Sequence, residues 1–242
     1  MCFIEVKDLT KIYKLGNRNI EALRGVNLCI KKGEFVKILG YSGSGKSTLI
    51  SIIGGLLAPT SGKVFIEGID IWSLSDKELS KLRNEKIGFI FQNMSLLPSL
   101  KVIDNVISPA IFASKNSKID VYERAKEILS LVGLESRIHS YPSELSGGEQ
   151  RRVSIARALI NDPDIILADE PTGELDIKTE RDIIELFKYL NRDLGKTIIV
   201  VTHSLRWLSV EGKTLIMKDG LIYDEVEDPE KFLLEGVKYE NS

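Results

Sequence analysis

A glycine-rich loop near the start of the chain has the residue types and spacing that hold phosphate groups. It runs Gly40-Tyr41-Ser42-Gly43-Ser44-Gly45-Lys46-Ser47 and fits G-x-x-x-x-G-K-[ST]. Its glycines let backbone N–H groups turn toward an anion, and a following helix N-terminus adds partial positive charge. Lys46 would reach the outer phosphates, and the Ser47 hydroxyl would bind Mg²⁺. The predicted nucleotide-binding residues here are Gly40, Ser42, Gly43, Ser44, Gly45, Lys46, Ser47 and Thr48.

A pair of carboxylates, Asp169-Glu170, ends the apolar run Ile165-Ile166-Leu167-Ala168. A parallel strand that ends in carboxylates brings them to the carboxyl edge of its sheet, where we also expect the phosphate loop. Asp169 would hold the water shell of a magnesium ion, and Glu170 would act as general base on the attacking water. The pair therefore predicts hydrolysis of the bound phosphate compound.

A third segment, Leu145-Ser146-Gly147-Gly148-Glu149-Gln150, comes directly before a predicted helix over residues 151–160. A serine followed by glycines at a helix start suits a second anion. The same residues also form ordinary helix caps and turns. The segment by itself therefore does not separate the two interpretations.

The elements that must position these residues alternate between strands and helices. Phe35–Leu39 reads as a strand that ends at Gly40, and a helical pattern begins after Gly45. Near-continuous apolar strands alternating with helices predict a parallel sheet covered on both faces. The other predicted strands are 3–8, 20–40 interrupted by a turn at Lys32-Gly33-Glu34, 63–68, 87–91, 165–168, 197–201 and 214–217. The predicted helices start at Ser75, run over 122–132 and 151–160, and include one with the stripe Ile183, Ile184, Phe187 and Leu190.

Composition narrows the classes of function. The chain has 33 basic and 35 acidic residues and a net charge of -2, so no global basic field predicts nucleic acid as a partner. The longest apolar run, residues 49–58, is interrupted by Ser51 and two glycines and falls short of the ~20 residues of a membrane helix. Charged residues from Glu5 onward argue against a signal peptide. We expect a cytoplasmic chain that would reach a membrane only through a partner.

The chain has only two cysteines, Cys2 and Cys29. Cys29 lies in the strand-like run Val26-Asn27-Leu28-Cys29-Ile30. We therefore predict a buried free thiol at Cys29 rather than half of a disulfide.

The order of the motifs resembles the ATP-binding-cassette family across nearly the whole chain. That order is phosphate loop, Gln92, Leu145–Glu149, Ile166–Glu170 and His203, and the LSGG run is specific to this family. The resemblance implies a single domain over residues 1–242 with an α/β fold: a P-loop NTPase core with a parallel sheet, an N-terminal antiparallel β subdomain and an inserted α-helical subdomain. Its expected parts are the core, 1–92 and 161–227, the helical subdomain, 93–160, and the C-terminal tail, 228–242.

The resemblance also implies roles for single residues. Tyr13 would stack on adenine, as a flat ring suits a purine face. Gln92 would contact magnesium and water and would begin the loop that couples ATP to a membrane subunit. Asp176 would lie in a dimer-contact loop, and His203 would contact the terminal phosphate. Together with Lys46 and Glu170, Gln92 and His203 form the predicted catalytic set, and Ser47, Gln92 and Asp169 the magnesium set.

Within the family, the chain is most similar to the lipoprotein-release and macrolide-export group. The pertinent stretches are residues 91–98, 102–106 and 168–173. This resemblance implies a homodimer with two sandwiched ATP molecules, each held by one chain's phosphate loop and by Ser146, Gly147 and Gly148 of the other. It also implies permease subunits on separate chains, and a place on the inner face of the cell membrane.

Three positions depart from the family pattern. Glu149 stands where glutamine is commonest, Glu174 where a small residue is usual, and Ser204 where aspartate often follows the histidine. None is expected to touch phosphate directly. They leave the rate of hydrolysis open.

Other functions share parts of this pattern. A cassette ATPase of DNA repair or translation would carry coiled-coil, zinc or tandem-cassette insertions, which this chain lacks. A phosphate-loop kinase would need an acceptor pocket in place of a polarised water. A cassette complex that does non-transport work, for instance in cell division, stays open.

Overall fold

The computed structural model describes residues 2–16, 18–113 and 120–224. The chain divides into two compact units, here called the first unit (Met1–Leu74 with Ile198–Ser242) and the second unit (Ser75–Thr197). Asn17 and the predicted tail over 228–242 lie outside the described residues. The expected boundaries of the helical subdomain, 93–160, stay a prediction.

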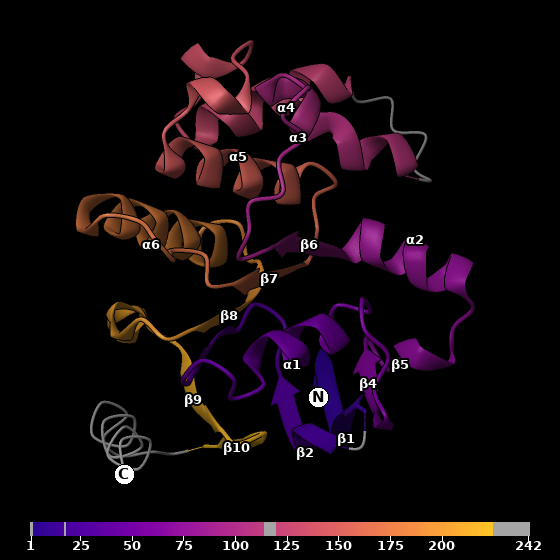
Figure 1. Cartoon of the computed structure of the whole chain (residues 1–242). Helices are drawn as coiled ribbons and strands as arrows, with labels where there is room; N and C mark the ends of the chain where they lie inside the picture. Colours follow the sequence, from indigo (N-terminus) through magenta and orange to yellow (C-terminus); the bar gives the residue numbers. More distant parts are fainter. Residues whose placement is uncertain (1, 17, 114–119, 225–242) are drawn as a thin grey trace. The chain divides into compact units, whose positions relative to one another are not determined.

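An antiparallel sheet forms one part of the first unit, as expected for the N-terminal residues (Figure 1). Its strand order is β2-β1-β4-β5. The predicted strand over 3–8 continues to Leu15, beyond the apolar alternation, because β1 stays paired with β2 along that length. The strands are β1 (Ile4–Leu15), β2 (Arg18–Ile30), β4 (Ser61–Ile66) and β5 (Ile69–Asp70).

The first unit also contains mainly parallel strands in the order β10-β9-β3-β8. The buried strand β3 pairs in parallel with β8 and with β9, and β10 is antiparallel to β9. The fully buried Trp207 packs near Phe35 with ring centroids 6.2 Å apart. The elements are β3 (Phe35–Leu39), α1 (Lys46–Ile53), η1 (Ile71–Ser73), β8 (Thr197–Thr202), η5 (Leu205–Ser209), β9 (Lys213–Lys218) and β10 (Leu221–Tyr223).

The second unit combines a parallel strand pair with helices. Strand β6 (Ile87–Ile90) runs parallel to β7 (Ile165–Asp169). Helices α3, α4 and α5 pack on one another (Figure 1). The predicted stripe of α6 is buried. The helical segments are α2 (Asp76–Lys86), α3 (Val102–Ile107), η2 (Ser108–Phe112), α4 (Val121–Leu131), η3 (Glu135–Arg137), η4 (Pro142–Glu144), α5 (Gly147–Leu159) and α6 (Ile177–Arg192).

The cysteine prediction is wrong. Cys29 is exposed and forms a disulfide with Cys2, with 5.4 Å between the two Cα atoms. The register of the β1–β2 hairpin explains the error, because Ile4 pairs with Ile30 and the Phe3 N–H donates to the Ile30 carbonyl at 2.7 Å. The residue before Phe3, Cys2, is thereby brought close to the residue before Ile30, Cys29. Along β2 the buried side chains are Leu28 and Ile30, so period-two alternation turns Cys29 to the other face.

The helices of the structure are short or amphipathic. Within residues 2–16, 18–113 and 120–224, none has both the length and the apolarity needed to cross a membrane.

Candidate functional site

The phosphate loop in the first unit follows β3 and leads into α1, the context that the sequence predicts. Two of its glycines are required sterically. A Cβ on Gly40 would lie 2.3 Å from the Met217 carbonyl oxygen, and one on Gly45 would lie 2.3 Å from that of Ala22. Gly45 also has φ +106°, in the region that favours glycine. The loop is thus shaped by its contacts with neighbouring strands.

Lys46 turns back over this loop. Its ammonium donates to the carbonyl oxygens of Gly40 and Tyr41, both at 2.8 Å, and its side chain is buried. A cation held here lies at the start of α1, where the helix dipole also favours an anion. The Lys46 ammonium and the start of α1 therefore both favour an anion at this loop.

Tyr13 and Thr48, predicted as nucleotide-binding residues, meet in the first unit. The Tyr13 hydroxyl lies 3.3 Å from Thr48 Oγ1, and the Lys11 ammonium lies 5.3 Å from the centre of the tyrosine ring. The ring is 38% exposed, on a strand rather than in a core. An exposed aromatic face tethered to the first turn of α1 suits the stacking of a base.

His203 and Gly40 leave the same edge of the first unit's parallel strands. Leu39 pairs with Thr202, and the Gly40 N–H donates to the Thr202 carbonyl at 3.2 Å. The exposed His203 is the next residue along the chain. The register therefore brings the predicted histidine to the phosphate-loop end of the strands. Ser204, one of the three positions that differ from the family pattern, also lies here. Its N–H donates to Thr202 Oγ1 at 3.0 Å.

In the second unit, β6 and β7 bring three predicted residues to one edge. Ile90 pairs with Ala168, so Gln92 and the carboxylates of Asp169 and Glu170 all follow the paired strand ends. Asp169 and Glu170 are 8% and 7% exposed. Glu170 has φ +46°, an uncommon conformation for a side chain this size. Such strain concentrates at functional sites.

Two arginines of α5 that sequence reasoning missed, the buried Arg151 and the half-buried Arg157, hold the loop that begins at Gln92. Arg151 donates to the carbonyls of Phe91 and Gln92 at 2.7 and 2.8 Å. Arg157 donates to those of Met94 and Ser95, each at 2.8 Å. Both come from α5, which follows the LSGGE segment. Burial lowers the pKa of each guanidinium. Basic residues on an amphipathic helix give no sign of such burial, so only the fold could reveal them.

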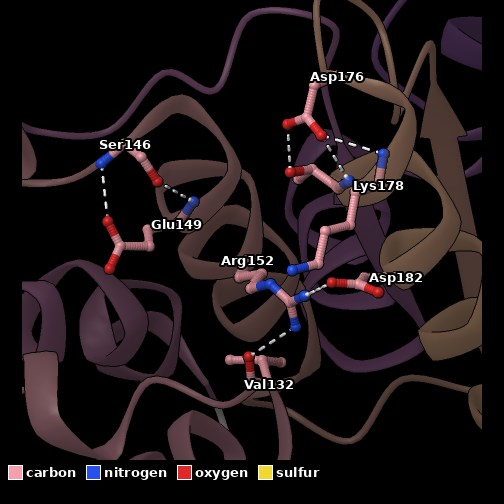
Figure 2. Close-up of polar contacts among 8 residues, drawn as sticks. Val132, Ser146, Glu149, Arg152, Asp176, Lys178 and Asp182 are labelled. Carbon is pink, nitrogen blue, oxygen red and sulfur yellow. Dashed lines mark hydrogen bonds and ion pairs between the residues drawn. The ribbon is translucent and has the colours of Figure 1, made fainter.

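The LSGGE segment forms the capped start of α5. Ser146 Oγ accepts the N–H of Glu149 at 3.2 Å, and the Glu149 carboxylate accepts the N–H of Ser146 at 2.8 Å (Figure 2). This is a reciprocal capping box. Ser146 and Gly147 remain exposed. A Cβ on Gly147 would meet nothing within 4 Å, so a side chain at this position would have room.

The predicted dimer-contact residue Asp176 caps α6. Its carboxylate accepts the backbone N–H groups of Lys178 and Thr179 at 3.0 and 3.1 Å, and also the Thr179 hydroxyl (Figure 2). These hydrogen bonds, the hydroxyl's first, lower the Asp176 pKa. Thr179, which sequence reasoning also missed, packs on the LSGGE segment. A Cβ on Gly148 would lie 2.5 Å from Thr179 Cγ2. The start of α5 therefore lies against the first turn of α6, which Asp176 caps.

The residues predicted to bind magnesium are divided between the two units. Each unit offers oxygen donors of the kind that Mg²⁺ selects: the Ser47 hydroxyl in the first, and the Gln92 amide and Asp169 carboxylate in the second. Magnesium usually binds through one or two carboxylates together with substrate phosphates, so it needs no dense acidic cluster. Within the described part of the chain, no group of three or more His, Cys, Asp or Glu forms a metal cluster of its own.

Comparison with known proteins agrees with this chemistry. The family model described as "ABC transporter" matches residues 23–173. The chain is 47% identical over 209 residues to the lipoprotein-releasing system ATP-binding protein LolD of Aquifex aeolicus, which covers 86% of this chain and 92% of that protein. It is 44% identical over 224 residues to the macrolide export ATP-binding/permease protein MacB of Rhodopirellula baltica, covering 92% of this chain but 33% of MacB.

A third relative has been solved. The ABC transporter ATP-binding protein MJ0796 of Methanocaldococcus jannaschii is 49% identical over 231 residues, which is 94% of this chain and 97% of that protein. Its dimeric post-hydrolysis structure, bound to ADP and Pi, matches with a TM-score of 0.85 and covers 91% of this chain and 98% of that one. The chain therefore belongs to the ABC transporter family, as an ATP-binding ATPase subunit of the lipoprotein-release and macrolide-export group.

Proposed function

We propose that this ATPase powers an exporter by closing as a homodimer around two ATP molecules and reopening after hydrolysis. The observation that carries this proposal is the exposed, capped start of α5 at Ser146 and Gly147. It is an open anion-suited segment that has no phosphate loop in its own unit, since that loop lies in the first unit. A second copy of the chain would supply the ATP that this segment contacts. The dimeric form solved for MJ0796 supports the same assembly.

In the proposed reaction, Lys46 exchanges its two loop carbonyls for the β- and γ-phosphate oxygens of ATP. Glu170 accepts a proton from the attacking water while the oxygen of that water bonds to the γ-phosphorus. The bond from that phosphorus to the β–γ bridging oxygen breaks, so ADP and phosphate leave. His203 would contact the γ-phosphate, and Tyr13 would stack on the adenine.

Mg²⁺, when bound, would neutralise developing charge on the phosphates. Ser47, Gln92 and Asp169 are the residues proposed to hold it. Gln92 has a further task in this proposal, since its loop would report the state of the site to the permease. The hydrogen bonds from Arg151 to Phe91 and Gln92 give that loop a firm connection to α5.

The proposed partner is a permease encoded on a separate chain. MacB, whose name includes both functions, is about three times as long as the segment that this chain matches. LolD, an ATP-binding protein by name, is matched over 92% of its length. The ATPase would therefore sit on the cytoplasmic face of the membrane, bound to permease subunits. The net charge of -2 gives no global basic field, so we expect no nucleic-acid partner.

The variant Glu170→Gln tests the base and the dimer together. It should bind ATP but lose turnover by about 10²- to 10⁴-fold, the contribution of a general base. It should also accumulate as an ATP-dependent dimer in gel filtration. The matched control is Glu185→Gln, an exposed residue of α6 that pairs with Lys188 and should keep full activity. Wild-type turnover in Glu170→Gln would overturn the assignment of the base.

Co-purification with membrane proteins tests the proposed partner. We expect the tagged chain, expressed in its source organism, to co-purify with a permease that has membrane-spanning segments and an external domain. Retention of a membrane protein with no transport activity would favour the non-transport alternative.

A further inference from the structure

Glu149 places a negative charge beside the segment proposed to contact phosphate. Its carboxylate accepts the N–H of Ser146 at 2.8 Å. That hydrogen bond, the largest cause, together with those from the Ser146 hydroxyl and Arg137, lowers the Glu149 pKa, so the side chain is ionised at neutral pH. A glutamine at this position would offer the same acceptor without charge. The acidic residue therefore keeps the helix cap but would repel an incoming phosphate.

Arg137 lies against this carboxylate. Its Nε donates to Glu149 Oε1 at 3.1 Å, on the oxygen that Ser146 does not use. Arg137 and Glu149 therefore form an ion pair. The two carboxylate oxygens are thus divided between the helix cap and the guanidinium.

Backbone hydrogen bonds fix the position of Arg137. It ends η3, where its N–H donates to Leu134 at 2.9 Å and its carbonyl accepts the N–H of Ser140 at 3.0 Å. The following residue, Ile138, accepts the N–H of Ile103 of α3 at 3.1 Å. The backbone that carries Arg137 is therefore held to a neighbouring helix.

We propose that Arg137 is a positioning residue for ATP-driven closure: it neutralises Glu149, so that this residue can cap α5 without repelling the terminal phosphate of ATP bound to the other copy. The inference rests on the proposed homodimer.

If the ion pair only stabilised the fold, its loss would lower the free energy of unfolding. The Arg137 and Glu149 side chains are 46% and 27% exposed, and pairs so open to water contribute little to folding. Loss of the pair should therefore leave the unfolding midpoint in urea nearly unchanged. Its effect should appear where a phosphate approaches, and only while Glu149 is charged.

The test is a cycle of variants built on Glu170→Gln, with ATP titrated against the dimer fraction measured by light scattering. Arg137→Gln should raise the ATP concentration for half-maximal dimer about fivefold to tenfold, as expected for one uncompensated charge near a phosphate. Glu149→Gln alone should stay within about twofold of its parent, because the amide oxygen keeps the cap. Adding Glu149→Gln to Arg137→Gln should restore the parent value.

Two further measurements support the charge argument. Arg137→Lys should recover part of the loss, and added salt should shrink the difference between Arg137→Gln and its parent. Binding of ATP to the monomer should be the same in all variants, because the phosphate loop is unchanged.

An equal loss from Arg137→Gln with and without Glu149→Gln would overturn the proposal in favour of a structural role, and so would no loss at all. If the Glu170→Gln parent dimerises with ATP, either of these results overturns only the role of Arg137, and the proposed function still holds. A parent that stays monomeric with ATP would instead overturn the dimer model and this role of Arg137 together.

Discussion

The phosphate loop and the LSGGE segment are both glycine-rich starts of helices, yet they are built in opposite ways. In the loop, Gly40 and Gly45 press against backbone carbonyls, and Lys46 is already folded over the site. At the LSGGE segment, Ser146 and Gly147 face open space, and the helix start is held by side-chain caps. The contrast supports our proposal that the phosphate loop holds the nucleotide within one chain and that the LSGGE segment completes a site on a second copy.

The largest effect should come from blocking the open region. Ser146→Arg puts a bulky cation where the second copy's nucleotide would dock, so ATP-dependent dimerisation should be abolished while monomer ATP binding persists. Gel filtration of this variant in the Glu170→Gln background measures the first, and equilibrium dialysis the second.

Lys46→Ala should have the opposite effect to Ser146→Arg. It should lose ATP binding by the monomer, because the ammonium at the phosphate loop is gone. Normal dimer formation by Ser146→Arg would remove the distinction between the two regions.

A methyl group probes the same contrast through stability. Gly45→Ala forces a side chain into φ +106° and against the Ala22 carbonyl, which should cost about 2–4 kcal/mol of the free energy of unfolding. Gly147→Ala is the matched control, since its new Cβ would meet nothing within 4 Å. Urea unfolding measures both. Similar losses in the two variants would show that the regions are packed alike.

The contact between Gly148 and Thr179 offers a finer test. Gly148→Ala should cost about 1–3 kcal/mol by overpacking, because its Cβ would lie 2.5 Å from Thr179 Cγ2. Thr179→Ser removes that methyl but keeps the hydroxyl that donates to Asp176. The double variant should therefore recover most of the loss in urea unfolding. A purely additive pair would mean that the clash is relieved elsewhere.

The smallest effect concerns the strand that leads into the phosphate loop. Lys37 of β3 is buried, and its ammonium donates to the Val210 carbonyl. Burial lowers the pKa of Lys37 below its unfolded value of about 10.4. Between the folded and unfolded pKa values the unfolded chain holds the extra proton, so the free energy of unfolding falls as the pH falls through this window.

Lys37→Met should remove that pH dependence. Relative to this variant, the wild type should be less stable at pH 8 than at pH 10, as measured by urea unfolding at each pH. Parallel pH curves for the two proteins would show that Lys37 does not titrate differently on folding.

Local patterns predicted most of the fold. The apolar runs at β3, β7 and β8, and the stripe of α6, have the periods of buried strands and of an amphipathic helix, and all are found as expected. Predictions failed where pairing decided the outcome. The extension of β1 to Leu15 and the Cys2–Cys29 disulfide both depend on the register of a hairpin, which no single-strand pattern contains.

The sequence by itself determined the chemistry of this ATPase. Motif spacing along one strand and one turn is enough to identify a phosphate loop, an acidic strand end and a family-specific LSGG run, because each is a local arrangement. Only the tertiary structure decided which neighbours each motif has. Arg137 on Glu149, Thr179 against Gly148, and Arg151 under the Gln92 loop join residues from separate elements. Such contacts depend on how distant segments pack, and packing is set by the whole fold rather than by local spacing.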